Sequence, residues 1–206
     1  MKTKFSIITL IFLALATFTT ANAQTAAQAR KVLDKTAAVV GSKGGASASF
    51  TMSNPKIGSA SGTISIKGKM FQATTPQAIV WFNGKTQWSY LKSTNEVSIT
   101  TPTEAKRMRM NPYTFLTMYK NGYNMSLSAS GKNHVVHLKA QNKQKSIQEM
   151  YVTINKTTYS PVQVKMREGS TWTTINISNF KAKNLPNSAF TFNAKDYPSA
   201  EVIDLR

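Results

Sequence analysis

A regular succession of β-prone runs and turn residues constrains the fold of this chain more than any other feature. From Ala46 onward, short runs rich in Thr, Ile, Val and aromatic residues are separated by turn residues every eight to twelve positions. This spacing is typical of antiparallel strands joined by short turns. We predict strands over residues 46–53, 58–67, 69–75, 78–83, 86–91, 95–100, 122–129, 133–140, 147–155, 161–167, 171–180 and 189–193.

The side-chain alternation within these strands indicates a sheet with one apolar face. Val162, Val164 and Met166 would face one way, and the polar residues between them the other way. Ile64 and Ile66 alternate with polar residues in the same manner. Because a sheet of about eleven strands twists and curls, we expect it to be strongly curved. Its concave apolar face then needs filling by helices, by ligand, or by both.

Two helices are predicted beside these strands. Residues 26–40 place apolar side chains on one stripe at helical spacing, and glycines follow at once. A second helix is expected over 112–120, because Asn111-Pro112 is a favourable helix start. Between two aromatic strands, Asn83-Gly84 is the strongest hairpin signal in the chain.

The N-terminus has the parts of a secretory signal peptide. Two lysines precede an uncharged run from Phe5 to Phe18, and Ala21 and Ala23 form an A-x-A cleavage signal. The alternative is an uncleaved anchor, but the run is shorter than the roughly twenty apolar residues that a spanning helix needs. We therefore predict a cleaved signal peptide over residues 1–23 and one exported domain over residues 24–206.

Composition narrows the possible partners. The chain has no cysteine, so disulfides and thiolate metal sites are excluded. It carries 26 basic residues against 8 acidic ones. An exported protein rarely meets nucleic acid, so we expect none as a partner; anionic lipid head groups or an acidic partner fit this charge better. A solvated basic surface that only confers solubility explains the charge equally well.

Residues suited to catalysis are sparse. His134 and His137 are three apart in a predicted strand, so they should point to opposite faces and cannot chelate one metal ion together. The eight acidic residues are dispersed, and no pair is placed for general acid-base work. The chain also lacks G-x-S-x-G and a phosphate-binding glycine loop. We expect no enzyme activity, no cofactor and no metal.

Apolar residues that could line a ligand cavity are plentiful. Methionine is flexible and polarisable, so a cavity lined with it adapts to ligands of variable shape. The alternative is that these residues form a dry core. The residues that we expect to line an acyl-chain cavity are Ile64, Ile66, Phe71, Trp81, Trp88, Tyr90, Phe115, Leu116, Met118, Met150, Val164 and Met166.

Several motifs, taken in order, resemble one known family. From Gly62 to Ile99 the chain reads GTISIKGKMF, then PQAIVWFNGKTQWSY, then NEVSI. Further along stand NPYTFL from Asn111 and AFTF from Ala189, followed by a tail with V-I-D. This order and spacing resembles the periplasmic outer-membrane lipoprotein carrier family, the LolA-type chaperones, over essentially the whole mature chain.

The resemblance implies both a fold and a function. The fold would be an incomplete antiparallel β-barrel of about eleven strands, with helices covering a hydrophobic cavity for lipoprotein acyl chains. The protein would be periplasmic, would accept cargo from an inner-membrane ABC-type lipoprotein release complex and would deliver it to an outer-membrane acceptor. A family arginine that ties the lid to the sheet corresponds here to Lys67 or Lys69, where lysine offers a point charge instead of a planar fork of donors. We expect a monomer.

Two other functional classes remain open from the sequence. A similar half-barrel can act as a lipid- or lipoprotein-sensing module, although such proteins usually carry an additional domain. The same scaffold can also carry another lipid or a glycolipid. An integral outer-membrane barrel is disfavoured, because many predicted strands are shorter than the 9–11 residues that a tilted span requires.

Overall fold

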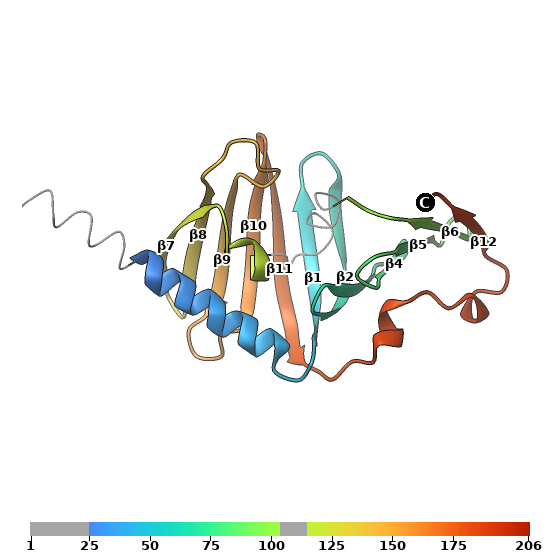
Figure 1. The fold of residues 1–206 in the computed structure, drawn as a ribbon, viewed down its shortest axis with the longest axis horizontal. Helices are drawn as coiled ribbons and strands as arrows, with labels where there is room; N and C mark the ends of the chain where they lie inside the picture. Colours follow the sequence, from blue (N-terminus) through green and yellow to red (C-terminus); the bar gives the residue numbers. More distant parts are fainter. Residues whose placement is uncertain (1–24, 104–114) are drawn as a thin grey trace, which may run out of the picture.

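The computed structural model describes residues 25–103 and 115–206. In this part of the chain, twelve strands form a single sheet, and a long helix lies across one side of it (Figure 1). The predicted signal peptide and the first residues of the predicted helix over 112–120 lie outside the described residues.

Except for the last one, which was not predicted, the strands agree closely with the predicted runs, because alternating apolar residues and Gly or Asn turn signals delimit them. They are β1 (Ala46–Asn54), β2 (Gly58–Lys67), β3 (Met70–Thr74), β4 (Ala78–Phe82), β5 (Gln87–Leu91), β6 (Glu96–Thr100), β7 (Tyr123–Ser130), β8 (Asn133–Ala140), β9 (Glu149–Asn155), β10 (Pro161–Glu168), β11 (Thr171–Ala182) and β12 (Glu201–Asp204).

The order of the strands shows that the sheet is open. It runs β12-β6-β5-β4-β3-β2-β1-β11-β10-β9-β8-β7, so β12 and β7 are its two edges. All neighbouring pairs are antiparallel except β12 and β6, which are parallel. The long connection between β11 and β12 allows this parallel pair, because parallel strands need a crossover. The predicted mainly β fold with an incomplete antiparallel barrel is confirmed.

A bulge bends the sheet where its two halves meet. The register between β1 and β11 shifts between Ser47 and Ser49, opposite the stretch around Asn179. Asn179 has a positive φ of 52°, a conformation that Asn tolerates better than most residues, and its side chain bonds the Ser49 hydroxyl. Such bulges strengthen the local twist of the sheet. The strands on either side therefore curve away from a common plane.

The predicted N-terminal helix is present over the described residues 25–41. In Figure 1 it crosses the half of the sheet that contains β7 to β11. The second predicted helix is seen as α3 (Phe115–Met118). In Figure 1 α3 lies near the N-terminal helix, on the way into β7.

The strand predicted over 189–193 is wrong. Pro186 precedes a short 3-10 helix, η2 (Asn187–Phe190), and a second one, η3 (Ala194–Asp196), follows. Because β3 and β4 already have strand partners on both sides, this segment has no free edge there to join. It uses Phe190 and Phe192 to cover the sheet instead, and Phe190 is fully buried.

The predicted Asn83-Gly84 turn connects β4 and β5. The Asn83 side-chain oxygen accepts the backbone N–H groups of Lys85, at 3.0 Å, and of Thr86, at 2.9 Å. Gly84 has a φ of 100°, which a residue with a Cβ rarely adopts. The turn spans four residues and brings Trp81 opposite Trp88.

Candidate functional site

The candidate site is the apolar face of the sheet beneath the N-terminal helix, which we call the helix face. Because side chains alternate along each strand, cross-strand partners from neighbouring strands form rows on this face. One row contains Val136, Val152 and Val164, and the next contains Leu138, Met150 and Met166. All of them are buried and belong to one continuous cluster.

The N-terminal helix covers the helix face with an apolar stripe. Ala29, Val32, Leu33 and Val40 recur at helical spacing and are buried in the same cluster. Thr36 is also buried on this side, but its hydroxyl donates to the carbonyl of Val32 at 3.0 Å, so it leaves no unpaired polar group. The helix therefore presents only apolar atoms and satisfied polar atoms to the sheet.

Polar side-chain contacts from Asp34 and Lys35 attach the helix to its surroundings. Directly after α3, the Tyr119 hydroxyl donates to Asp34 at 2.5 Å, and the Arg30 guanidinium lies 5.9 Å from the centre of the Tyr119 ring. Near the loop between β9 and β10, Lys35 donates to the Tyr159 hydroxyl at 3.1 Å. Burial, together with the bond to the Asp34 carboxylate, raises the pKa of Tyr119 to about 12. Tyr119 therefore remains a neutral donor at physiological pH.

The helix face contains half of the twelve residues predicted to line a cavity. Ile64, Ile66, Phe71, Met150, Val164 and Met166 are all buried in its cluster. Leu116 and Met118 of α3 are half-buried and pack against that cluster. Phe115 begins α3, and its side chain lies outside the described part. Apart from Phe115, these residues, drawn from both halves of the sheet and from α3, share one apolar region.

The three remaining aromatic residues lie on the opposite side of the sheet, which we call the outer face. Phe71 and Phe82 are cross-strand partners, and both lie on the helix face. Trp81 is next to Phe82 in β4, and its cross-strand partners are Gln72 and Trp88. Trp81 therefore points away from Phe71, and Trp88 and Tyr90 share its side. A single cavity cannot contain both groups of residues.

Aromatic residues from the C-terminal segment cover this part of the outer face. The ring of Trp81 meets Phe192 and Tyr197 edge-on, at centroid distances of 5.6 Å and 5.7 Å. Tyr197 also packs against Tyr90 at 4.7 Å. These contacts were not predicted, because Phe190 and Phe192 were assigned to a strand over 189–193 and Tyr197 to no element.

Of the two lysines expected to tie a lid, Lys67 contacts the C-terminal segment. The Lys67 ammonium donates to the carbonyl of Leu185 at 2.8 Å, in the segment that follows β11. Lys69 lies exposed in the turn between β2 and β3. The described attachments of the N-terminal helix come instead from Asp34 and Lys35.

The outer face of β8 to β11 has a network of charged and aromatic side chains. Glu149 accepts hydrogen bonds from Arg167 at 2.9 and 3.0 Å, from His137 at 2.8 Å and from Tyr151 at 3.2 Å. Burial raises the pKa of Glu149, but these three donors together hold it below its usual range. A carboxylate so fully engaged stays charged and is a poor general acid.

The two histidines do not converge on a metal ion. His137 stacks on Tyr151 on the outer face, with ring centres 4.4 Å apart, whereas His134 lies 6.1 Å from Tyr159. His134 and His137 are three residues apart in β8, so their side chains point to opposite faces of the sheet. Among the described residues, no group of three or more His, Cys, Asp or Glu side chains could hold a metal ion.

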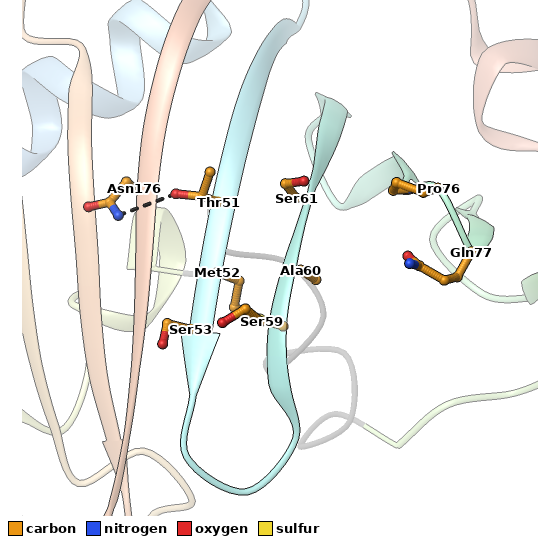
Figure 2. A pocket seen from close by; sticks show the side chains of 9 residues that line it. All are labelled: Thr51, Met52, Ser53, Ser59, Ala60, Ser61, Pro76, Gln77 and Asn176. Atoms are coloured by element: carbon orange, nitrogen blue, oxygen red, sulfur yellow. Dashed lines mark hydrogen bonds between the residues drawn. The ribbon is translucent and has the colours of Figure 1, made fainter.

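A pocket of about 350 Å³ opens near the tip of the β1–β2 hairpin. Figure 2 shows its lining from β1, β2, β11 and the turn between β3 and β4. The lining side chains are uncharged, and all except Met52 are small or polar: Thr51, Met52, Ser53, Ser59, Ala60, Ser61, Pro76, Gln77 and Asn176. Asn176 donates to the Thr51 hydroxyl at 3.3 Å. No signal for this pocket was recognised in the sequence.

Comparison with known families gives one extensive match. The family described as "Outer membrane lipoprotein carrier protein LolA" matches residues 16–170. No curated protein sequence matches the chain. In the described part of the chain, no helix has the length and apolar character needed to cross a bilayer.

Solved structures with a similar fold share little sequence with this chain. An uncharacterized conserved protein from Thermus thermophilus is 13% identical with a TM-score of 0.57, covering 86% of this chain and 99% of that one. A DUF1329 family protein from Desulfovibrio piger is 12% identical with a TM-score of 0.51, covering 82% and 98%. A LolA superfamily protein from Nitrosomonas europaea is 10% identical with a TM-score of 0.41, covering 80% and 97%. The first two support the fold assignment.

Proposed function

The chain belongs to the outer membrane lipoprotein carrier (LolA) family, and from that premise we propose that its helix face shields lipoprotein acyl chains in transit. The signal peptide over residues 1–23 would direct the domain over 24–206 to the periplasm. An inner-membrane ABC-type release complex would supply the cargo, and an outer-membrane acceptor would take it. No covalent chemistry is required of the carrier.

One observation supports this proposal most strongly. The apolar face of an open sheet is covered by a separate helix, and the polar contacts that attach this helix are side-chain bonds such as Asp34–Tyr119 and Lys35–Tyr159. Each such bond contributes little on its own, about 1–3 kcal/mol. The helix can therefore move away without breaking any strand pairing, and the face beneath it would accept acyl chains in its place.

The energetics of such an exchange suit a carrier. Removing an acyl chain from water is worth about 0.8 kcal/mol per methylene, so a long chain gains on the order of 10 kcal/mol. Displacing the helix exposes Val32, Leu33 and Val40 and offsets part of this gain. Binding is then strong enough for transit and weak enough for release, with ligand shifting the balance between closed and open forms.

Uptake of a fluorescent acyl probe by the purified mature protein tests the proposal. Met118→Asp places a charge beside the apolar cluster and should reduce uptake at least tenfold. The matched control is Ile57→Asp, at a hairpin tip where the side chain is 72% exposed, and it should bind the probe as the wild type does. Failure of the wild type to bind any acyl probe would contradict the proposed function.

The identity of the cargo needs a second measurement. Mass spectrometry of an organic extract of the purified protein separates a triacylated or diacylated peptide from a free lipid or a glycolipid. A lipopeptide supports lipoprotein transport, whereas a glycolipid alone would assign the same apolar face to a different cargo.

A further inference from the structure

We propose that the free edge of β2 over residues 58–62 binds, as an added strand, the extended peptide that follows the acylated residue of a cargo lipoprotein. This inference rests on the proposed function and adds to it a second site that holds the polypeptide of the cargo. The site is the pocket shown in Figure 2.

Among the described strands, none pairs with this edge, because β3 is much shorter than β2. Along its full length β2 pairs with β1, but on its other side only Thr63 to Lys67 pair with β3. Within residues 25–103 and 115–206, no strand pairs with residues 58–62 on that side. An unpaired strand presents main-chain donors and acceptors that readily accept another extended chain.

The turn after β3 explains why the pairing stops. Thr75 and Ala78 bond each other through the Thr75 amide and hydroxyl, which folds the chain back towards β4. Pro76 lies inside this turn and has no N–H to offer to β2. Lys92 bonds the carbonyls of Thr75 and Gln77 and fixes the turn from the far side. The turn therefore forms a stable wall of the pocket.

Gly62 marks the point where the two strands separate. A Cβ at this position would lie 2.0 Å from the carbonyl oxygen of Thr74, so only glycine allows β3 to approach and then turn away. Towards the hairpin tip, the space left beside β2 opens into the pocket, which is lined by Ser59, Ala60 and Ser61.

The lining favours a neutral peptide recognised through its main chain. The pocket has hydroxyl and amide groups from Thr51, Ser59, Gln77 and Asn176 but no charged side chain. Small side chains on the wall leave room for varied residues on the ligand, while main-chain hydrogen bonds provide the affinity. A carrier with many different cargoes needs this kind of tolerance.

The pocket also adjoins the apolar interior. Met52 lines the pocket and packs against the buried cluster of the helix face, and Ala60 lies directly opposite it on β2. Acyl chains on the helix face would therefore place the first residues of their attached peptide within reach of the edge of β2. This continuity favours a lipid-linked peptide over an unrelated one.

The test compares two probes on the full mature protein. One is a diacyl-cysteine followed by a short peptide of serine and asparagine, and the other is the same diacyl-cysteine as an amide without the peptide. We expect the lipopeptide to bind about tenfold more tightly, because several main-chain hydrogen bonds are added. It should also slow amide hydrogen exchange within residues 58–62, which the shorter probe should not do.

N-methylation of the peptide provides a sharper readout. In an added strand, every second residue directs its N–H group towards the neighbouring strand, and the residues between direct theirs away from it. N-methylation of the first set should therefore abolish the tenfold gain in affinity, and N-methylation of the second set should not. Ser61→Trp should fill the pocket and remove the gain while leaving the shorter probe bound. The control, Ser126→Trp, changes an exposed serine of the distant edge strand β7 and should have no effect.

The outcomes separate the two proposals. Equal binding of both probes, with no protection of residues 58–62, overturns the edge site and leaves the acyl-binding function intact. Loss of affinity with either methylated set alike also contradicts strand addition. If neither probe binds, the proposed function fails and the inference fails with it.

Discussion

Tyr119 connects two elements that must separate if ligand enters beneath the helix. Its hydroxyl bonds Asp34 of the N-terminal helix, and its ring is buried in the core directly after α3. Nothing in the sequence pattern singles out this pair, because the two residues are 85 positions apart. Likewise, the sequence supplies Trp81, Trp88 and Phe71 as equal candidates for one cavity. Only the register of β3, β4 and β5 reveals that they lie on opposite faces.

Removing the Tyr119 hydroxyl should loosen the helix without disturbing the core. Tyr119→Phe keeps the buried ring and loses one bond to a carboxylate, so the free energy of unfolding should fall by about 1.5–3 kcal/mol. Stopped-flow measurement should show faster uptake of the acyl probe. The control is Tyr90→Phe, which loses a bond to Asn95 on the outer face and should leave the uptake rate unchanged. Equal rates for all three proteins would contradict this account.

The buried tyrosines also predict an alkaline limit to stability. Burial raises the pKa of Tyr123 to about 12, as burial and Asp34 do for Tyr119. Both pKa values exceed the value of about 10 that tyrosine has in the unfolded chain. The stabilisation that these pKa shifts contribute to the folded state is therefore complete below about pH 10 and is lost as pH rises towards 12. Chemical denaturation between pH 9 and 12 measures this slope. Tyr119→Phe should make it shallower, and an unchanged slope would exclude Tyr119 as a contributor.

At the level of elements, prediction from the sequence succeeded where local patterns decide the structure. Strands with polar and apolar alternation, the Asn83-Gly84 turn and the amphipathic helix ending near Gly41 all require only neighbouring residues. The prediction of strands failed after Ala182. There the F-x-F motif covers a face instead of pairing, and the short strand β12 forms only because the edge of β6 is available. Both outcomes depend on which edges the rest of the sheet leaves open.

The contact between β2 and β3 gives a prediction about a single glycine. In Gly62→Ala the new methyl group would meet the backbone carbonyl of Thr74, which cannot move without disturbing the strand pairing. We expect a loss of about 2 kcal/mol or more in the free energy of unfolding. Gly41→Ala is the matched control, because nothing lies within 4 Å of its added Cβ. Equal stability of the two variants in urea titrations would contradict the close approach.

For the whole molecule, the combination of an open sheet, a covering helix held by side-chain contacts and an excess of positive charge agrees with the proposed carrier that visits membranes. The 26 basic and 8 acidic residues are spread along the chain, so the field acts at long range and not through one cluster. Acyl binding on the helix face, by contrast, depends on apolar contacts. The two steps should therefore respond differently to ionic strength.

Salt should separate docking from cargo binding. Raising the ionic strength from about 0.01 M to about 1 M shortens the screening length from about 30 Å to about 3 Å. Sedimentation with anionic phospholipid vesicles should show much weaker docking at high salt, whereas affinity for the acyl probe should stay nearly constant. If probe affinity falls in parallel with docking, charge and not burial would dominate cargo binding.

Cross-linking the helix to the sheet tests the central claim most directly. The chain has no cysteine, so Lys35→Cys with Tyr159→Cys introduces a unique pair at an existing contact. A short bismaleimide should close the helix over the helix face, and a disulfide-containing linker should do so reversibly. The control pair is Ser128→Cys with Val135→Cys, which joins β7 to β8 at cross-strand partners. We expect the helix cross-link to abolish acyl-probe uptake and its reduction to restore it, with the control unaffected; full uptake by the cross-linked protein would contradict entry beneath the helix.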